Sequence, residues 1–280
     1  MSGMDSSDWT TDRKGYEAFC LFLRTACGIV LGDNKEYLVS SRLNKLMKEH
    51  GIDSLGELVT RLEQYPASRL YALVVDAMTT NETSWFRDIY PYDFLAEQLL
   101  PEMVAANRAP RIWSAAASSG QEPYSISIII QELLENRNIA LKQAEIIATD
   151  ISQTVLRDAR EGVFDQMALD RGMSAARLNN YFEPVGTMWR LKSEVRGRID
   201  FREVNLLQSY ATLGKFDVIF CRNVLIYFSA ETKKDILARI AGALKPRGYL
   251  FLGGSESMAN YSECFDVVRL RNGLVYQLKE

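Results

Sequence analysis

The feature that most constrains the fold is an alternation of short apolar segments with longer amphipathic ones, which begins at Arg111. A strand-like segment followed by a helical segment recurs three times, at 111–115 with 122–136, at 145–151 with 152–164, and at 216–228 with 230–244. Strands that alternate with helices in this way form a parallel sheet that is covered by helices on both faces. We therefore predict a doubly wound, mostly parallel α/β domain, to which 249–254 adds a further strand.

Two parts of this domain depart from the alternation. The C-terminal segment has two strand-like runs around Asn272-Gly273, a dipeptide typical of tight primed turns. It predicts a terminal hairpin that adds an antiparallel strand to the sheet. Residues 165–198 carry scattered charge, three glycines and the β-like run 187–195. They predict an insertion in the sheet, which we expect to contain a small β-hairpin.

The first part of the chain has a helical pattern instead. Four segments before residue 79 place apolar residues at intervals of three and four, which is the spacing of one face of a helix. Gly28 is the expected end of the first helix, and Asp53 or Ser54 is the expected N-cap of the third. The change of pattern predicts a helical domain at 1–78 and a second domain at 79–280.

The composition disfavours several classes of function. The net charge is −3 and the isoelectric point is near 5.5, so the chain lacks the basic field of a duplex-binding protein and we expect no nucleic acid partner. No apolar run approaches the roughly 20 residues of a membrane span, and the polar N-terminus is unlike a signal peptide. We therefore expect a cytoplasmic protein without direct membrane insertion.

The cysteine and histidine content narrows the chemistry further. The four cysteines form no CxxC pair, and His50 is the only histidine. A zinc site and a Ser-His-Asp or Cys-His mechanism are therefore not expected. We expect four reduced, buried thiols and no metal.

The segment 114–120 is the expected turn between the first strand and the first helix of the sheet. Doubly wound sheets bind ligands at the carboxyl ends of their strands, and the small side chains of this turn let a flat ligand approach the backbone. Glu122, in the first helical turn, would repel a phosphate. Asp150 ends the next strand, 28 positions later (150 − 122), and is suited to accept hydrogen bonds from both hydroxyls of a ribose. An adenosine-type ligand with a positive charge and no phosphate is S-adenosylmethionine.

Each of these features also has a purely structural interpretation. Glu122 would interact favourably with a helix dipole, and Asp150 would cap the helix that follows it. A nicotinamide dinucleotide is a weaker alternative, because the turn contains only Gly120 and lacks the G-x-G-x-x-G pattern. Together, and in this order at one edge of a sheet, the features favour S-adenosylmethionine.

Five stretches of the sequence carry a resemblance to a known family. They are MTTNETSWFRD at 78–88, IWSAAASSGQEPYSI at 112–126, ATDIS at 148–152, VNLL at 204–207 and FDVIFCRNVLIYF at 216–228. Through these stretches, and over nearly its whole length, the chain resembles the chemotaxis receptor methyltransferases, often called CheR. The resemblance implies a helical N-terminal domain joined to a Rossmann-like S-adenosylmethionine-dependent methyltransferase domain with a small β insertion, which coincides with the architecture predicted above.

The resemblance also implies an activity. It is the methylation of specific glutamate γ-carboxylates on methyl-accepting chemotaxis receptors, which gives glutamyl methyl esters and S-adenosylhomocysteine and serves bacterial chemosensory adaptation. The implied partners are the cytoplasmic domains of these receptors, so we expect a cytoplasmic monomer that is recruited to membrane-bound receptor arrays.

The family's motifs assign roles to individual residues of this chain. The residues that match cofactor contacts are Asn81, Thr83, Arg87, Glu122, Asp150, Asn205, Leu206, Arg222 and Asn223. Arg87 would either orient the substrate carboxylate or hold the carboxylate of the cofactor. Tyr227, expected at the carboxyl end of its strand, would shape the methyl-transfer pocket. Of all these residues, only Glu122 and Asp150 also follow from the strand and helix pattern.

A basic face on the segment 34–51 is the expected receptor contact. The basic residues are Arg42, Lys45 and Lys48, and the residues expected to face the interior are Tyr37, Leu38, Leu43, Leu46 and Met47. Spacing alone is more typical of a solvated surface. The acidic helical bundle implied as substrate favours a role in binding. In this family the β insertion can also hold a receptor's C-terminal peptide as an added strand, but it is shorter here than expected for such a member, which favours action without a peptide tether.

Three other kinds of protein remain as alternatives. A nucleic-acid methyltransferase would show a basic groove and an Asn/Asp-Pro-Pro-aromatic stretch where this chain reads CRNVLIYF. A small-molecule methyltransferase, or a non-catalytic signalling protein that binds the cofactor, would keep the same cofactor residues. Detection of base-labile methyl esters on receptors separates these alternatives from receptor methylation.

Overall fold

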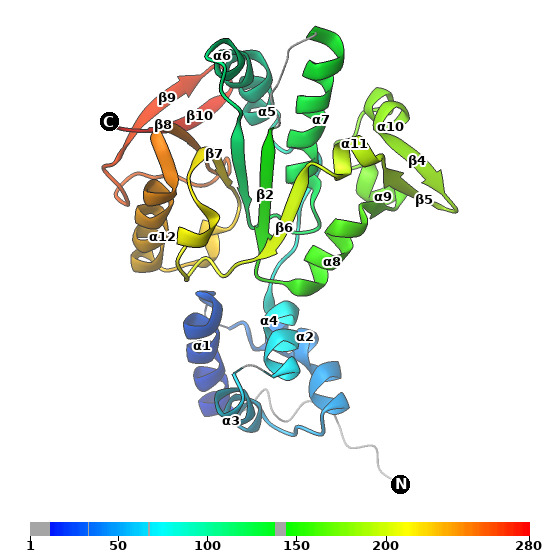
Figure 1. Ribbon diagram of the computed structural model, residues 1–280. Helices are drawn as coiled ribbons and strands as arrows, with labels where there is room; N and C mark the ends of the chain where they lie inside the picture. The colour runs from blue at the N-terminus through cyan, green and yellow to red at the C-terminus, as the bar shows by residue number, and fades with distance from the viewer. Residues whose placement is uncertain (1–11, 33, 67, 138–143) are drawn as a thin grey trace. The chain divides into compact units, whose positions relative to one another are not determined.

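A computed structural model describes residues 12–32, 34–66, 68–137 and 144–280 (Figure 1). The chain forms two compact units. The first extends to Thr80 and also contains Tyr227–Ser229, and the second contains Asn81–Ile226 and Ala230–Glu280. Within the described ranges, no helix combines the length and the apolar character that a membrane span requires.

The first unit is helical, as the apolar spacing predicted. Its helices are α1 (Arg13–Cys27), α2 (Glu36–Glu49), α3 (Leu55–Gln64) and α4 (Arg69–Met78). Gly28 ends α1 in the left-handed conformation, with φ 78°, which a glycine adopts without steric cost. Ser54 is the N-cap of α3, and its hydroxyl accepts a hydrogen bond from the Glu57 N–H at 3.1 Å. The helix end and the cap predicted for these positions are confirmed.

Helix α2 buries a narrower stripe than the sequence predicted. Val39, Leu43 and Met47, spaced four residues apart, are buried. Tyr37 is 83% exposed, so the prediction that it faces the interior is wrong. Two residues before Val39, a side chain lies about 200° round the helix from the buried stripe and so points to solvent.

The second unit is built on a seven-stranded sheet in the order β6-β2-β1-β7-β8-β10-β9 (Figure 1). The strands are β1 (Arg111–Ala115), β2 (Glu145–Asp150), β6 (Ile199–Glu203), β7 (Phe216–Cys221), β8 (Leu244–Phe251), β9 (Phe265–Leu270) and β10 (Gly273–Leu278). Strands β6, β2, β1, β7 and β8 are parallel, whereas β10 is antiparallel to both β8 and β9. The predicted doubly wound, mostly parallel sheet is confirmed. The strand order reverses beside β1, whose neighbours are β2 and β7, and such sheets bind ligands beyond the carboxyl ends of the strands at that point.

Helices complete the layers around this sheet. Helix α7 (Gln121–Arg137) and α8 (Gln153–Glu161) contact β2 and β6, and α12 (Ala230–Ala243) leads into β8. The sequence pattern predicted these three helices. It did not assign the helical stretch formed by α5 (Tyr90–Phe94), a π-helical turn (Leu95–Leu99) and α6 (Leu100–Ala105).

Strand β7 is shorter than predicted. It ends at Cys221, and the predicted strand end at residue 228 lies seven residues further on (228 − 221). Asn223 has φ 57°, which no strand residue adopts, and a 3₁₀ helix follows at Leu225–Tyr227. The apolar pattern continues past the strand because Leu225 and Phe228 are buried within this irregular turn.

The terminal hairpin is confirmed, but its turn differs from the prediction. Gly273 pairs with Leu270, so Arg271 and Asn272 form the turn, and neither has a positive φ. The turn is therefore not the primed type that Asn-Gly favours. Gly273 is required for space, since an added Cβ would lie 2.6 Å from the Tyr90 ring.

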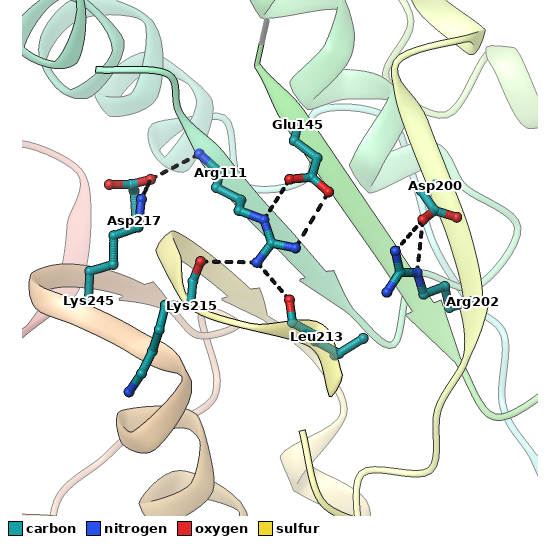
Figure 2. A network of polar contacts seen from close by, with 8 residues as sticks. All are labelled: Arg111, Glu145, Asp200, Arg202, Leu213, Lys215, Asp217 and Lys245. Atoms are coloured by element: carbon teal, nitrogen blue, oxygen red, sulfur yellow. Dashed lines mark hydrogen bonds and ion pairs between the residues drawn. The ribbon is translucent and has the colours of Figure 1, made fainter. Parts of the chain in front are cut away.

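The amino ends of the strands are held by charged side chains (Figure 2). Arg111 donates to Glu145 Oε2 at 2.5 Å and to the Leu213 carbonyl at 2.6 Å. The buried Asp217 carboxylate accepts from the Arg111 backbone N–H at 3.0 Å and from Lys245 Nζ at 2.7 Å. These contacts join the starts of β1, β2, β7 and β8.

The predicted insertion is a small subdomain with a three-stranded antiparallel sheet in the order β3-β5-β4. Its elements are β3 (Val163–Phe164), α9 (Gln166–Leu169), α10 (Ala175–Tyr181), β4 (Phe182–Val185), β5 (Met188–Leu191) and α11 (Ser193–Arg196). The expected hairpin is formed by β4 and β5, with Gly186 at φ 62° in its turn. Strand β4 lies at an edge of this sheet.

The cysteines differ from expectation at two positions. Cys27 and Cys221 are buried and Cys20 is half-buried, but Cys264 is exposed. Cys264 lies just before β9, at an exposed position of the loop between β8 and β9. Burial raises the pKa of the Cys221 thiol well above its usual value, which makes this thiol unreactive.

Candidate cofactor site

The loop between β1 and α7 has an unusual backbone. Ala116 and Ser118 have φ 61° and φ 52°, and Gly120 has φ 96°. Positive φ is unfavourable for residues other than glycine and is often found at functional sites. The loop is held by close packing, because a Cβ on Gly120 would lie 2.9 Å from the Tyr124 ring, and by a hydrogen bond of 2.8 Å from the Ser118 hydroxyl to the Asn81 carbonyl.

Asp150 fixes this loop from the end of β2. Its Oδ2 accepts the Ser118 N–H at 2.8 Å and its Oδ1 accepts the Ser152 N–H at 3.0 Å. Helix α8 is capped by Ser152 and not by Asp150, since the Ser152 hydroxyl accepts the Val155 N–H. Each carboxylate oxygen is able to accept more than one hydrogen bond. The position therefore fits an acceptor for ligand hydroxyls.

A buried ion network joins the ends of three segments. Arg222, which follows β7 and has a side chain only 1% exposed, donates to Glu122 Oε2 at 3.1 Å, to Asp88 Oδ2 at 2.6 Å and to the Arg87 carbonyl at 2.8 Å. Glu122 also accepts from the Ser114 hydroxyl at 2.8 Å. Glu122 is therefore more than a favourable charge in the first turn of a helix.

The network combines two carboxylates with one guanidinium. Burial raises the pKa of Glu122, while Arg222 and the Ser114 hydroxyl lower it, and the raising effect is the larger. For Arg222, burial alone would lower the pKa, but Glu122, Tyr92 and Asp88 together raise it. Arg222 is thus fully charged, and the excess of carboxylate suits a ligand that carries positive charge.

The guanidinium of Arg87, unlike that of Arg222, is not engaged by other described residues. The Arg87 side chain is half-buried, and in the described part of the chain its guanidinium takes part in no ion pair or hydrogen bond, although its carbonyl accepts from Arg222. A half-buried guanidinium of this kind favours a carboxylate ligand. Arg222 is already engaged by protein partners, which favours a positioning role for it over the direct cofactor contact that the resemblance implied.

The segment that leads to Arg87 is anchored in the insertion. The Trp85 ring is 1% exposed and packs edge-on against Phe164 of β3 and Phe182 of β4, with centroids 4.9 and 5.5 Å away. Its backbone N–H donates to the Arg171 carbonyl at 3.0 Å. Gly172 is required beside it, because an added Cβ would lie 2.2 Å from the Trp85 carbonyl oxygen.

The next residue is anchored in the same way. Phe86 has φ 49°, and the Arg177 guanidinium of α10 lies 3.8 Å from its ring centroid. Glu132 of α7 orients Arg177 through two hydrogen bonds of 2.8 and 3.0 Å. The insertion therefore packs against the segment that carries Arg87.

The other predicted cofactor residues lie on loops of the second unit. Asn205 and Leu206 follow β6, and the Val204 N–H donates to the Asp150 carbonyl at 2.9 Å, which brings their loop beside Asp150. Asn223 follows Arg222 directly. Thr83 lies between Asn81 and the anchored Trp85, in a segment without regular structure.

Several predicted residues lie in the first unit. Tyr227 is half-buried and ends a 3₁₀ helix, so its predicted place at the end of a strand is wrong. Lys45 and Lys48 are exposed on α2. Arg42 instead donates to the Met78 and Thr79 carbonyls at 2.8 and 2.9 Å, where it caps the C-terminus of α4.

Sequence reasoning missed Glu256, which follows β8. Its carboxylate accepts backbone hydrogen bonds from Asn223, Gly253 and Ile226. The only local signal is an acid placed three residues after a glycine at the end of a strand. Asp88 was missed as well, because its partner Arg222 lies 134 positions away in the chain.

These features fit S-adenosylmethionine better than a phosphate-bearing dinucleotide. The loop after β1 has small side chains, Asp150 presents a buried carboxylate at the carboxyl edge, and the ion network has an excess of carboxylate. A pyrophosphate would be repelled at the N-terminus of α7 by Glu122. Arg87 would hold a carboxylate at the same edge.

Comparison with known proteins identifies the family. Residues 81–274 match the family described as CheR methyltransferase, SAM binding domain, and residues 14–79 match CheR methyltransferase, all-alpha domain. The chain is 53% identical to chemotaxis protein methyltransferase Cher2 of Pseudomonas putida over 96% of its own length and 100% of that protein. It is 54% identical to chemotaxis protein methyltransferase 1 of Pseudomonas aeruginosa over 94% of its own length and 97% of that protein. The chain thus belongs to the CheR methyltransferase family and is an S-adenosylmethionine-dependent methyltransferase.

Proposed function

We propose that this protein transfers the methyl group of S-adenosylmethionine to γ-carboxylates of glutamates on the cytoplasmic domains of methyl-accepting chemotaxis receptors. The observation that carries the proposal is the identity of about one half, over nearly the full length of both chains, to proteins named chemotaxis protein methyltransferases. The half-buried Arg87, which is not engaged in an ion pair among the described residues, supports a site that receives a carboxylate.

The chemistry requires little acid–base help from the protein. The side chain of a solvent-exposed glutamate titrates near pH ~4.3 and is ionised at neutral pH, so its oxygen attacks without a general base. The cofactor, when bound, supplies an activated methyl group. The protein's contribution is to bring the reacting atoms into line, and positioning of this kind lowers a barrier by roughly 7–11 kcal/mol in favourable systems. This accounts for an enzyme that has a single histidine.

The proposed residue roles follow the geometry. Asp150 would accept the hydroxyls of the cofactor ribose, and Arg87 would bind a carboxylate, either that of the substrate or that of the cofactor. Arg222 would hold Glu122 and Asp88 in place. The side chains of Asn81, Thr83, Asn205 and Asn223 and the backbone of Leu206 would complete the cofactor contacts.

An assay for base-labile methyl esters tests the proposal. Receptor-containing membranes incubated with the protein and methyl-labelled S-adenosylmethionine should gain label that mild alkali releases as methanol. Membranes from a strain without chemoreceptors are the control. Alkali-stable label, label on nucleic acid, or no label despite cofactor binding would favour the other methyltransferase classes or a non-catalytic protein.

Tyr227 is proposed to shape the methyl-transfer pocket. Replacement by phenylalanine should keep cofactor affinity and turnover within a fewfold of wild type, because the ring remains. Replacement by alanine should lower kcat by about a hundredfold, since small errors in the alignment of reacting atoms have effects of this size. Calorimetry and methyl-ester kinetics measure the two properties separately, and equal turnover of all three proteins would remove Tyr227 from the pocket.

The helical unit is proposed to bind the receptor through the exposed basic residues of α2. Arg42 must be left intact in a test, because its guanidinium caps α4. The double variant Lys45→Glu, Lys48→Glu should keep its fold and cofactor affinity but lose roughly tenfold or more of its receptor methylation rate at low salt. The difference should shrink as salt rises, since the Debye length is about 8–10 Å at 0.10–0.15 M.

A matched control lies on a neighbouring helix of the same unit. Arg13 and Lys14 are exposed on α1, and Arg13→Glu, Lys14→Glu makes the same change in net charge. Rates lowered equally by both double variants would mean that overall charge, and not α2, governs the encounter with receptors.

A further inference from the structure

The Glu256 carboxylate joins two loops at the carboxyl edge of the sheet. Its Oε2 accepts the Asn223 N–H and the Gly253 N–H, each at 2.7 Å, and its Oε1 accepts the Ile226 N–H at 3.3 Å. Asn223 and Ile226 follow β7, whereas Gly253 follows β8. The two strands are parallel neighbours, so one side chain ties together the backbones that leave them.

The contact holds a conformation that the loop would not adopt by itself. Asn223 has φ 57°, in the left-handed region that side chains other than glycine disfavour. The approach of the two loops also depends on Gly253, because an added Cβ would lie 2.6 Å from Asn223 Nδ2 and 2.8 Å from Glu256 Oε2. One oxygen of the side chain accepts both amides, so the position of that oxygen holds the two loops together.

The residues fixed in this way are those that build the site. Arg222, the residue before Asn223, holds Glu122 and Asp88, and Asn223 itself matches a cofactor contact. Glu256 is half-buried. Burial is the main cause of the raised pKa of Glu122, and the Glu256 charge adds to it.

We propose that Glu256 is a positioning residue, which sets cofactor affinity by fixing the backbone at Asn223 and Gly253 and not by contact with the cofactor. The inference rests on the proposed function only through the role of Asn223 as a cofactor contact. If Glu256 acts by fixing the backbone, cofactor affinity should depend more on the length of its side chain than on its charge.

Glu256→Gln and Glu256→Asp separate the effect of side-chain length from the effect of charge. Glu256→Gln loses the charge but keeps an oxygen that is able to accept both 2.7 Å hydrogen bonds, so the Kd for S-adenosylhomocysteine should stay within about threefold of wild type. Glu256→Asp keeps the charge but is one methylene shorter, and Glu256→Ala loses the acceptor. Both should raise the Kd by roughly tenfold or more, with the KM for S-adenosylmethionine raised and the KM for receptor unchanged.

Hydrogen exchange gives a readout that does not depend on activity. The amides of Asn223 and Gly253 should exchange slowly in wild type and in Glu256→Gln, and faster in the other two variants. Gly253→Ala should weaken cofactor binding in the same way while Glu256 is intact. The control is Glu263→Ala, which removes an exposed acid seven positions away (263 − 256) and should change neither the Kd nor the exchange.

The outcomes are distinct. A Kd that is raised in Glu256→Gln and normal in Glu256→Asp would mean that Glu256 acts through its charge, and a wild-type Kd in all variants would mean that it has no role in the site. Either result overturns the inference, and the Gln and Asp pair decides the matter even where Glu256→Ala fails to fold. Wild-type protein that binds cofactor but does not esterify receptors contradicts the proposed function and leaves this test valid.

Discussion

Replacement of Arg222 by methionine is expected to lower the free energy of unfolding by about 3–5 kcal/mol, because it leaves Glu122 and Asp88 without the guanidinium that neutralises them. The Glu122 side chain is 12% exposed, so water replaces little of the partner it loses, whereas Asp88 is 36% exposed and is solvated by water. Denaturant unfolding of the second unit measures the change. Methylation should be lost as well, since Arg222 also holds the Arg87 carbonyl.

The loss of stability should depend on pH. Burial already raises the pKa of Glu122, and Arg222 opposes that rise, so removal of Arg222 raises the pKa further. A carboxyl whose pKa is higher in the folded than in the unfolded state contributes stability that is full below the unfolded value, about 4.3, and is lost as pH rises through the folded value. The folded-state pKa of Glu122 is higher in the variant than in wild type, so the variant loses more stability as the pH rises. The difference between the two proteins should therefore be larger at pH 8 than at pH 5.

A surface pair in the same unit provides the control. Arg202 and Asp200 of β6 form an ion pair of 2.6 Å whose side chains are 39% and 52% exposed (Figure 2). Arg202→Met should cost at most about 1 kcal/mol, as is usual for exposed pairs. Similar losses in the two variants would show that the Arg222 network adds nothing beyond an ordinary surface pair.

Replacement of Asp150 by alanine is expected to abolish measurable binding of S-adenosylmethionine and of its product S-adenosylhomocysteine. Two ribose hydroxyls would lose their acceptor, at roughly 1–3 kcal/mol each. The variant also frees the Ser118 and Ser152 amides, which Asp150 fixes at 2.8 and 3.0 Å, so the loop after β1 would no longer be held in its strained conformation.

Calorimetry measures the affinity directly. Asp150→Asn should bind cofactor with intermediate affinity, because the amide keeps one acceptor oxygen and turns its NH₂ group towards one of the two backbone amides. Asp200→Ala removes an exposed carboxylate from the adjacent strand and should leave the affinity unchanged. An unaltered Kd in Asp150→Ala would remove Asp150 from the proposed site.

The parts of the fold that sequence predicted are those set by local periodicity. The alternation of strands and helices from Arg111, the helical spacing before residue 79 and the terminal hairpin each depend on residues within a few positions of one another. The position of Asp150 at the carboxyl edge of the sheet could be predicted for the same reason, because the carboxyl end of a strand in such a sheet is fixed by the pattern itself.

The contacts that sequence did not predict join partners that lie far apart in the chain. Arg42, predicted as a receptor contact, caps α4 through acceptors 36 and 37 positions away. Arg222 and Glu122 are separated by 100 positions. Helical spacing and apolar patterns carry no information about such contacts, so neither the capping role of Arg42 nor the bridging role of Arg222 could be predicted from them.

Strand β7 was predicted too long for a different reason. Burial of Leu225 and Phe228 continues the apolar pattern, but Asn223 turns the backbone away from the strand. A buried irregular turn and a buried strand look alike in an apolar pattern. The Asn223 N–H in this turn donates to Glu256, which lies in the loop after β8, and this again is a distant contact.

The packing of Trp85 between Phe164 and Phe182 has a consequence for how this fold is able to change in evolution. The insertion packs against the segment that carries Arg87. Loss of the insertion would expose the buried tryptophan and remove the Arg171 and Arg177 contacts. Selection on catalysis alone would therefore retain the insertion in a lineage whose receptors carry no peptide tether. The exposed edge of β4 would be free to drift in such a lineage, while the aromatic and glycine positions behind it would stay fixed.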